Sequence, residues 1–496
     1  MKKLPAVFII STSLLSAIVL IGMFAPSFLG TITASIQSYI TDYFGWYYLI
    51  VVTCFLLVCF YLFLTPVGRI KLGKNDDKPD FSRGSWLAML YSAGMGIGLV
   101  FYGAAEPISH FAINSPTNQE GTAQGIKDAL RFTFFHWGFH AWAVYAIVGL
   151  VIGYFMFRKK EPAVISATLK PVLGDKVYGK TGTIINVLAI LSTVFGIATT
   201  LGFGALQING GLSYLFDIPV SFSIQLVIIL IVSVLFILSA VSGLGKGIKI
   251  LSNTNMVLAF SLLLLVFFIG PSLSNLNLLT DSIGSYLHNL PRMSFRMAPL
   301  NPEGRQWIND WTIFYWAWWI AWSPFVGIFI ARISKGRTIR EFVLNVLLVP
   351  SIMSFIWFTI FGGTAIQVET EGTSVSKLNL EQLLFGVFDQ LPLGTVISFI
   401  AILLVIIFFI TSADSGTFVL GMMSTNGLQN PPNQVKVIWG VMLSAIALVL
   451  LNSGGLIGLQ NAMIIAALPF SIIMILMTIS LFISLNKEVN QLMKKM

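Results

Sequence analysis

The chain has 496 residues, of which 56% are hydrophobic and 10% are charged. Soluble globular domains carry about 25% charged residues, so the composition excludes an ordinary soluble protein. Lysine and arginine together number 29 against 20 aspartates and glutamates, which gives a net charge of +9. The two cysteines, Cys54 and Cys59, lie in one apolar run at a spacing that does not favour a disulfide, and we expect no redox or metal role for them.

Twelve apolar runs are long enough to cross a bilayer as helices, for which about 20 residues suffice. We expect these spans at residues 6–28, 45–66, 85–105, 130–156, 183–207, 220–242, 255–277, 308–330, 343–365, 395–421, 434–452 and 461–485. The first run follows Lys2 and Lys3 without a small-residue cleavage site, so we expect it to remain in the protein as a helix. The sequence therefore predicts an all-α integral membrane protein with 12 transmembrane helices.

The basic residues predict the orientation of these spans. They concentrate at the two ends of the chain and in the segments 69–83, 158–180, 246–249 and 332–340. Because Lys and Arg are enriched on the cytoplasmic side of membrane proteins, we expect both termini and these segments inside the cell. We expect a multi-pass protein of a bacterial-type plasma membrane, in contact with membrane lipid. Since topology explains the positive charge, we expect no nucleic-acid partner.

The last ten spans form two groups of five with similar lengths, and an odd number makes the two groups antiparallel. The first span of each group carries residues that interrupt helices, namely Gly94 to Gly98 in one and Ser323-Pro324 with Gly327 in the other. Paired interruptions predict a binding site at mid-membrane between the repeats of a secondary transporter. The alternative is that the glycines only allow close packing of helices.

These groups divide the chain into five regions. We expect helices 1 and 2 with a cytoplasmic loop at 1–84, and a first inverted repeat, helices 3 to 7, at 85–278. An external connecting segment follows at 279–307, then a second inverted repeat, helices 8 to 12, at 308–485. A short cytoplasmic tail occupies 486–496.

Five tryptophans lie between Trp311 and Trp322 of the eighth span. Trp318 and Trp319 share a helix face with Trp322, because residues three or four apart are neighbours on a helix surface. Tryptophan normally anchors the ends of a span at the membrane interface, but this series continues towards the middle. Aromatic ring faces bind a quaternary ammonium cation, at about 0.5–2 kcal/mol per contact. The series predicts either such a site or packing between helices.

The fourth span contains His136, Trp137, His140, Trp142 and Tyr145. Trp137 and Tyr145 are eight residues apart, hence on roughly one side of a helix, and together they could complete an aromatic cage. The two histidines could serve a proton relay or a metal. No carboxylate or cysteine cluster accompanies them in the sequence, so we expect hydrogen bonds to neighbouring helices instead of a metal.

The tenth span supplies hydroxyl oxygens from Thr411, Ser412, Ser415 and Thr417, and one acid, Asp414. Such hydroxyls, together with free carbonyls of an unwound glycine-rich segment, could coordinate a hard cation. Hydrogen bonds from the hydroxyls to their own helical turn are the alternative. The sequence contains no set of nucleophile and base, phosphate-binding loop or paired catalytic carboxylates, so we do not expect an enzyme.

A resemblance to a known family covers most of the chain. It rests on two groups of motifs, Gly94-Met95-Gly96-Ile97-Gly98 with Phe101-Tyr102-Gly103 and Glu106-Pro107, and Tyr315-Trp316-Ala317-Trp318-Trp319 with Trp322-Ser323-Pro324-Phe325. In these motifs the chain resembles the betaine/choline/carnitine transporter (BCCT) family, and most closely its sodium-coupled glycine-betaine carriers. The resemblance implies a LeuT-like core, a 5+5 inverted repeat preceded by two extra helices. It also implies a homotrimer.

The resemblance further implies where ligands bind. The substrate-binding residues carried over by motif are Trp137, Tyr145, Trp319 and Trp322, with Trp318 and Phe325 adjacent, and Met95, Gly96 and Gly98 of the glycine-rich segment. One sodium site corresponds to the backbone oxygens of Ser92 and Met95 with Phe408, Thr411 and Ser412. A second sodium site resembles Thr193 with Phe325, but Ile197 stands where a second threonine is expected, which weakens that assignment.

These observations predict a sodium symporter that imports glycine betaine or a related quaternary-ammonium solute, with sodium as the coupling ion and no other cofactor. Proton-coupled choline carriers of this family often carry Asp where Gly98 stands, so the glycine favours a zwitterion whose carboxylate meets backbone N–H groups. Proton-coupled choline uptake and exchange of carnitine or its precursors are the alternatives within transporters. An osmosensor that binds an ammonium ligand without moving it is the alternative from another class.

Overall fold

The structure is a computed structural model that describes residues 5–94, 96–242 and 245–493, most of which lie in helices. The α-helices are α1 (Ala6–Phe24), α2 (Pro26–Leu64), α3 (Arg83–Gly94), α4 (Ile97–Ile108), α5 (Ala123–Trp137), α6 (Phe139–Gly153), α7 (Lys170–Leu173), α8 (Lys180–Phe216), α9 (Phe222–Ser242), α10 (Gly245–Ile269), α11 (Ser272–Ser294), α12 (Pro302–Trp307), α13 (Phe314–Ile333), α14 (Ile339–Thr370), α15 (Leu380–Asp389), α16 (Gly394–Ser424) and α17 (Asn433–Met493). Short 3-10 or π-helical segments are η1 (Pro66–Arg69), η2 (Ser109–Ile113), η3 (Tyr154–Arg158), η4 (Ser166–Leu169), η5 (Gly174–Tyr178), η6 (Ile308–Ile313) and η7 (Val375–Lys377).

Ten helices among the described residues are long and apolar enough to cross a membrane, and α3 with α4 adds an eleventh crossing if the bent pair is one span. Helix α17 extends over 61 residues and contains one non-helical residue, Gly455, where two helices meet. These features confirm the predicted all-helical membrane architecture. The count of twelve spans and the LeuT-like relation between the repeats stay predictions.

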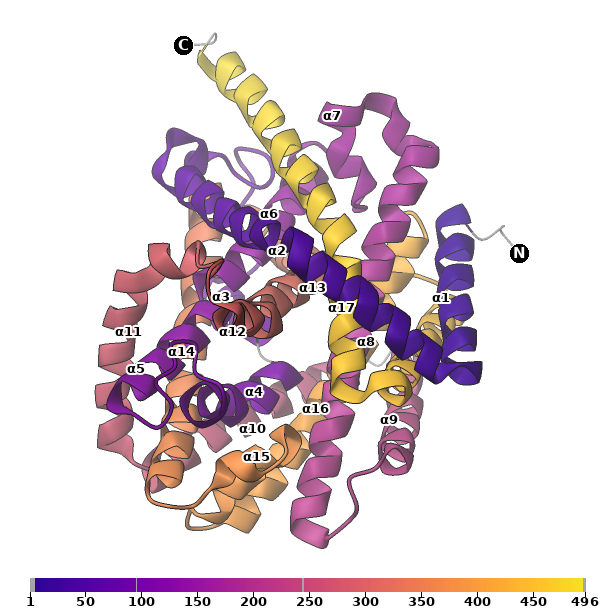
Figure 1. Cartoon of the computed structure of the whole chain (residues 1–496). Helices are drawn as coiled ribbons and strands as arrows, with labels where there is room; N and C mark the ends of the chain where they lie inside the picture. The colour runs from indigo at the N-terminus through magenta and orange to yellow at the C-terminus, as the bar shows by residue number, and fades with distance from the viewer. Residues whose placement is uncertain (1–4, 95, 243–244, 494–496) are drawn as a thin grey trace.

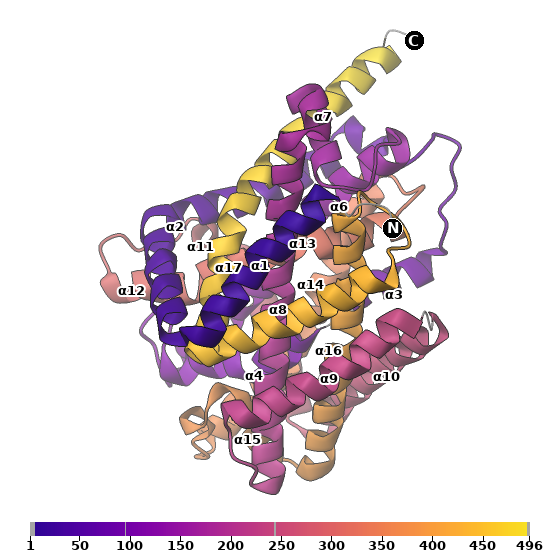
Figure 2. The ribbon, with the colours of Figure 1, turned by 90° about the vertical axis from the view of Figure 1, so that its right-hand side faces the viewer.

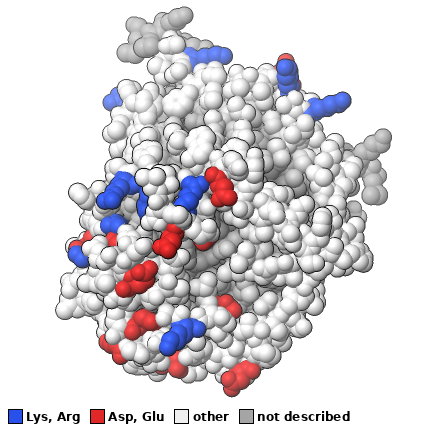
Figure 3. Space-filling view, in the orientation of Figure 1, with Lys and Arg blue, Asp and Glu red and all other residues white. Residues whose placement is uncertain are grey.

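Helix α13 lies inside the bundle, where it packs against α6, α8 and α17 (Figure 1). Helix α8 runs alongside α16 and α17, and the C-terminal end of α17 projects beyond the other helices (Figure 2). The outer helices α9 and α10 expose large apolar side chains such as Leu238 and Phe268. Most of the face in Figure 3 carries no charged side chain. An uncharged, apolar periphery is what a protein in contact with lipid chains requires.

The first break in the helices confirms one prediction from the glycine-rich segment. Helix α3 ends at Gly94, α4 begins at Ile97, and the two axes make an angle of 62°. Met95 lies outside the described residues. The break places the start of α4 inside the bundle, where its first backbone N–H groups have no helical acceptor.

The predicted interruption of span eight is wrong, because α13 continues through Pro324. Proline lacks the N–H that would bind the carbonyl four residues earlier, which is that of Ile320. The hydroxyl of Ser323 donates to this carbonyl at 2.8 Å, so the missing donor is replaced within the helix. Helix α13 therefore keeps its tryptophans at regular helical spacing.

A second break, which the sequence analysis did not predict, divides span four. Helix α5 ends at Trp137 and α6 begins at Phe139, with Gly138 between them in a non-helical conformation. A Cβ atom at position 138 would lie 2.5 Å from the carbonyl oxygen of Phe134 and 2.9 Å from the hydroxyl of Tyr286. Only glycine fits this close approach.

Two predicted boundaries near the N-terminus and the centre are also wrong. Helix α2 begins at Pro26, so residues 29–44, expected outside the spans, are helical. The hydroxyl residues of this segment lower its mean hydropathy, which is why the sequence did not predict a span here. Their hydroxyl groups can nevertheless bond to their own helix, as Thr33 does to the carbonyl of Leu29. Helix α10 ends before Gly270-Pro271, inside the predicted span 255–277, and α11 begins at Ser272. The mixed polarity of α11 hides it from a search for apolar spans.

The variant Ser323→Ala tests whether the Ser323 hydroxyl replaces the hydrogen bond that Pro324 cannot donate to Ile320. The variant leaves the Ile320 carbonyl without a donor inside the protein, and an unsatisfied buried acceptor costs about 1–3 kcal/mol. We expect a lower midpoint of thermal unfolding in detergent. Thr359→Ala is the matched control, because the Thr359 hydroxyl also donates to a helix carbonyl, that of Phe355, but no proline removes the amide donor there. Equal losses in both variants would contradict the role of Ser323.

Candidate functional site

A cavity lies inside the bundle, where α4, α5, α6, α8, α13 and α14 meet. Its empty space amounts to about 520 Å³, a volume that includes space open to solvent. The lining residues are Gly96, Ile97, Gly98, Leu99, Trp137, Ala141, Trp142, Tyr145, Thr200, Trp318, Trp319, Trp322 and Ser354. Most of this lining is aromatic or apolar.

Aromatic rings form walls at steep angles to one another. Trp318 and Trp319 stack with their centroids 5.2 Å apart and their planes 7° apart. Trp137 stands edge-on to Trp319, at 4.9 Å and 72°. Tyr145 meets the same ring at 5.9 Å and 76°. These rings contact one another, and a cation in the corner that they form meets aromatic surfaces from more than one direction.

Three indole N–H groups of the cavity are bound by the protein itself. Trp319 donates to the carbonyl of His136 at 2.9 Å, and Trp322 donates to the carbonyl of Gly196 at 2.8 Å. Trp137 donates to the carboxylate of Glu106 at 2.8 Å. Because an indole has a single N–H and no acceptor, these rings can offer a ligand only their carbon surfaces.

Glycines make these contacts possible. In a continuous helix the carbonyl of His136 would accept the amide of residue 140, so the break at Gly138 leaves it for Trp319. A Cβ atom on Gly196 would lie 2.8 Å from the ring of Trp322. A Cβ atom on Gly98 would lie 2.4 Å from the ring of Trp318. The positions of the rings thus depend on the absence of side chains opposite them.

Most of the residues predicted for the substrate meet in this cavity. Those that line it are Gly96, Gly98, Trp137, Tyr145, Trp318, Trp319 and Trp322. Phe325 lies beside the cavity, with its ring 5.4 Å from that of Trp322. The predicted contribution of Met95 lies outside the described residues. Sequence reasoning missed Thr200 and Ser354, because single hydroxyl residues in α8 and α14 carry no pattern that distinguishes them.

Of the residues predicted for the first sodium site, Ser92 lies in α3, and Phe408, Thr411 and Ser412 lie in α16. Met95 lies outside the described residues. The hydroxyl of Thr411 donates to the carbonyl of Ile407 at 2.9 Å and accepts from the amide of Asn255 in α10 at 3.1 Å. The buried side-chain oxygen of Asn255 has no hydrogen-bond partner among the described residues. Amide oxygens of this kind are ligands of hard cations, and the sequence analysis had not singled out Asn255.

The second predicted sodium site finds no support in the contacts of Thr193. Its hydroxyl donates to the carbonyl of Ala189 at 2.8 Å and lies 3.9 Å from the sulfur of Met423. Hard cations bind oxygen, and a thioether is a soft ligand. The described contacts of Phe325, the other proposed member, include the ring of Trp322 but give no link to Thr193.

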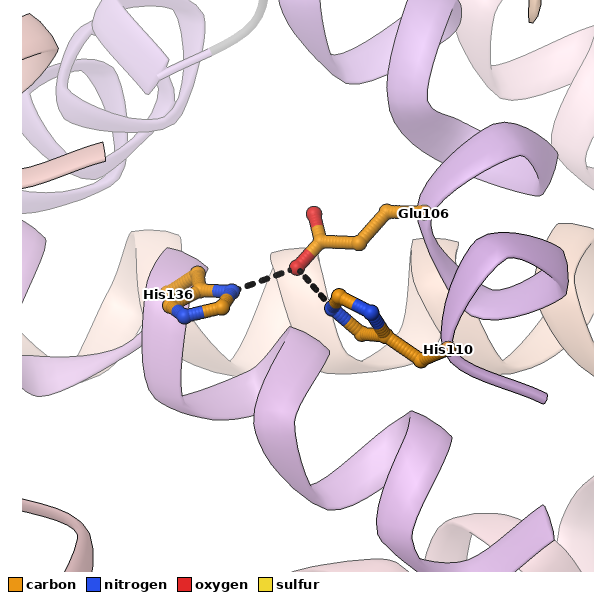
Figure 4. A group of neighbouring side chains, drawn as sticks. All are labelled: Glu106, His110 and His136. Carbon is orange, nitrogen blue, oxygen red and sulfur yellow. Dashed lines mark hydrogen bonds and ion pairs between the residues drawn. The ribbon is translucent and has the colours of Figure 1, made fainter. Parts of the chain in front are cut away.

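Figure 4 shows a buried polar cluster of Glu106, His110 and His136. It lies behind the cavity wall, because Trp137, which lines the cavity, donates to Glu106. The two ring nitrogens of His136 lie 2.7 Å from Glu106 and 3.0 Å from the hydroxyl of Thr312. His140 lies 3.0 Å from the hydroxyl of Ser294. The predicted hydrogen bonds of both histidines to neighbouring elements are confirmed. The carboxylate that accompanies His136 comes from α4 and is distant in the sequence, which is why the pattern of span four did not reveal it.

Comparisons with known proteins agree with this architecture. Residues 6–490 match the family model described as BCCT, betaine/carnitine/choline family transporter. The chain is 58% identical over 495 residues to the "Glycine betaine transporter OpuD" of Bacillus subtilis, an alignment that covers 100% of this chain and 97% of that protein. It is 43% identical to the "Glycine betaine transporter" of Acinetobacter baylyi, over 95% of this chain and 72% of that protein. It is 42% identical to the "Ectoine/hydroxyectoine transporter" of Virgibacillus pantothenticus, over 97% and 96% of the two chains.

The chain belongs to the betaine/carnitine/choline family of transporters. The resemblance seen in the sequence motifs is thereby confirmed, and so is the prediction that the chain is a transporter and not an enzyme. Its helices make it a multi-pass membrane protein.

Gly98 and Gly284 provide a matched pair that tests the fit of the rings. Gly98→Ala places a methyl group 2.4 Å from Trp318, whereas a methyl group at Gly284, in α11 and outside the cavity lining, meets no atom within 4 Å. We expect Gly98→Ala to displace the ring, alter the near-ultraviolet circular dichroism of the purified protein and weaken glycine betaine binding by about tenfold or more. Gly284→Ala should resemble the native protein in both measurements. Similar behaviour of the two variants would refute the steric role of Gly98.

Proposed function

We propose that the chain is a secondary active transporter that imports glycine betaine, or a closely related quaternary-ammonium compatible solute, by sodium symport and alternating access. Family membership and the names of the relatives support the substrate class. The observation that carries the proposal is the aromatic cavity, in which the N–H groups of Trp137, Trp319 and Trp322 are bound to protein acceptors. A trimethylammonium group has no N–H to donate and is held by ring faces alone.

The start of α4 suits the other end of such a solute. Ile97 and Gly98 belong to its first turn and line the cavity. The amides of a first helical turn lack partners inside the helix, and the helix dipole places partial positive charge there. A carboxylate therefore finds donors at this end while the ammonium group contacts the rings. This arrangement favours a zwitterion over choline, which carries a hydroxyl group in place of the carboxylate.

The proposal also names sodium as the ion that is coupled to transport. The hydroxyl of Thr411 and the amide group of Asn255 meet where α16 contacts α10, and the Asn255 oxygen has no hydrogen-bond partner among the described residues. Helix α16 also packs against α4, which begins at the break in span three. A cation bound between these elements would stabilise the break, and it would then be coupled reciprocally to the substrate held by α4. Sodium imported with a zwitterion carries one charge inward, which a membrane potential favours by about 2.3 kcal/mol per 100 mV.

We further propose that the protein lies in a bacterial plasma membrane as a homotrimer with both termini in the cytoplasm. The distribution of Lys and Arg supports the orientation, and membership in the family supports the trimer. Labelling of single cysteines placed near each terminus checks the orientation, and light scattering of the protein in detergent checks the trimer. Labelling of a terminal cysteine from outside the cell would contradict the orientation. A mass equal to that of one chain would contradict the trimer.

Uptake into proteoliposomes tests the function, with sodium and proton gradients imposed separately. We expect glycine betaine uptake to require an inward sodium gradient and to be enhanced by a negative interior. Full uptake in potassium under a proton gradient alone would exclude sodium coupling and favour the proton-driven alternative. Binding without uptake under any gradient would favour the osmosensor. Competition with choline, carnitine and ectoine in the same vesicles then ranks the substrates.

Substitutions in α16 test the sodium site. Thr411→Ala combined with Ser412→Ala removes two hydroxyl ligands, so we expect the sodium concentration for half-maximal uptake to rise by about tenfold or more. The order of preference among substrates should stay the same. Thr417→Ala serves as the control, because the Thr417 hydroxyl donates to the carbonyl of Asp414 in its own helix. An unchanged sodium dependence in the double variant would show that the coupling ion binds at another site.

A further inference from the structure

The carboxylate of Glu106 is the centre of the polar cluster behind the aromatic cavity (Figure 4). One of its oxygens lies 2.7 Å from Nδ1 of His136 and 3.3 Å from Nε2 of His110. The other oxygen lies 2.8 Å from Nε1 of Trp137 and 2.5 Å from the hydroxyl of Tyr315. Glu106 and both histidines have no exposed surface. Helices α4, α5 and α13 and the segment η2 thus meet at one carboxylate.

The donors around Glu106 indicate which groups carry charge. The indole of Trp137 can only donate, and an ionised carboxylate can only accept. His136 satisfies both of its contacts as a neutral ring, in which Nδ1–H donates to Glu106 and Nε2 accepts from the hydroxyl of Thr312. Among the described residues, the ion pairs of Glu106 involve only the two histidines. An ionised Glu106 with two neutral histidines fits these contacts, because four donors then surround the carboxylate.

Two of these donors connect the carboxylate to the cavity. Trp137 lines the cavity and stands edge-on to Trp319. The ring of Tyr315 stacks on Trp318 at 6.0 Å and on Trp319 at 5.8 Å. One carboxylate oxygen therefore accepts from Trp137, which is part of the cavity wall, and from Tyr315, on which Trp318 and Trp319 stack. A buried ion in a membrane protein is costly, which makes such an arrangement a candidate for function.

We propose that Glu106 is the positioning residue of the aromatic cavity and its fixed negative charge, which attracts the ammonium group of the substrate through the ring of Trp137. This inference rests on the proposed function, because it presumes an ammonium ligand. The carboxylate acts without touching the ligand. Its hydrogen bonds set the orientation of Trp137 and Tyr315, and its charge raises the affinity for a cation in a region of low dielectric constant.

The geometry of Glu106, His110 and His136 fits a hydrogen-bonded carboxylate better than it fits a metal site. The ligand atoms of Glu106, His110 and His136 lie within 4.8 Å of one another. Zinc bound at about 2.0–2.2 Å to tetrahedral ligands keeps those ligands more than 3 Å apart, whereas Glu106 and His136 are 2.7 Å apart, the length of a hydrogen bond. The second carboxylate oxygen is occupied by two donors. The hydrogen bonds therefore account for these atoms without an ion.

A pair of isosteric ligands separates the charge of Glu106 from its effect on packing. Glycine betaine and 3,3-dimethylbutanoate have the same shape and the same carboxylate, but carbon replaces the ammonium nitrogen in the second compound. Binding of both to the full-length protein is followed by tryptophan fluorescence in the presence of sodium. We expect Glu106→Gln to weaken glycine betaine binding by about tenfold or more, because the variant loses both the buried charge and an acceptor that positions the rings. Binding of 3,3-dimethylbutanoate should weaken by a smaller, few-fold factor, because this ligand is affected by the ring positions but gains nothing from the charge.

Two further variants complete the test. Tyr315→Phe removes one donor and keeps the charge, so we expect it to weaken both ligands by a similar, few-fold factor. Ser294→Ala removes the partner of His140 away from the cavity and should change neither affinity. If Glu106→Gln does not fold, Tyr315→Phe still decides the positioning role, because an unchanged affinity for both ligands would overturn it.

The outcomes distinguish this inference from the proposed function. Equal weakening of both ligands by Glu106→Gln would overturn the role of the charge, and unchanged glycine betaine binding would overturn the inference as a whole. In either case the native protein still binds glycine betaine, and the proposed function stands. Native protein that binds 3,3-dimethylbutanoate as tightly as glycine betaine would overturn both, because the site would then not recognise an ammonium group.

Discussion

The arrangement of the site depends on where the indole N–H groups of the cavity are bound. Trp319 and Trp322 donate to the backbone carbonyls of His136 and Gly196, and Trp137 donates to Glu106. A buried indole N–H without an acceptor would be costly, so each of these bonds fixes a ring orientation. With these three N–H groups bound inside the protein, Trp137, Trp319 and Trp322 present ring surfaces without an N–H donor to a ligand.

Much of the site follows from the sequence because its aromatic residues are local motifs. The spacing of Trp318, Trp319 and Trp322 places them on one helix, and the run Gly94 to Gly98 indicates the break before α4, both of which the structure shows. The break at Gly138 was missed, since a lone glycine in an apolar run is more often a packing residue. Its necessity comes from Phe134 and Tyr286, and the latter lies far away in the sequence.

The errors in the prediction arise from compensation between residues. Pro324 was expected to interrupt its helix, but the neighbouring Ser323 replaces the lost hydrogen bond at Ile320. Glu106 belongs to a recognisable motif, yet its role depends on partners in other helices, His136 and Tyr315, which no local pattern connects to it. Contacts over such sequence distances require the fold.

The central claim is that the cavity selects an ammonium group without N–H donors, and stepwise methylation of one ligand tests it most directly. Affinities of the purified protein are measured for glycine betaine, dimethylglycine, sarcosine and glycine, which share a carboxylate and differ in the number of N–H groups. Each N–H buried against ring faces without an acceptor costs about 1–3 kcal/mol. The account predicts that affinity falls at every step from glycine betaine to glycine, by about tenfold or more per step. Equal affinity for glycine betaine and dimethylglycine would contradict it.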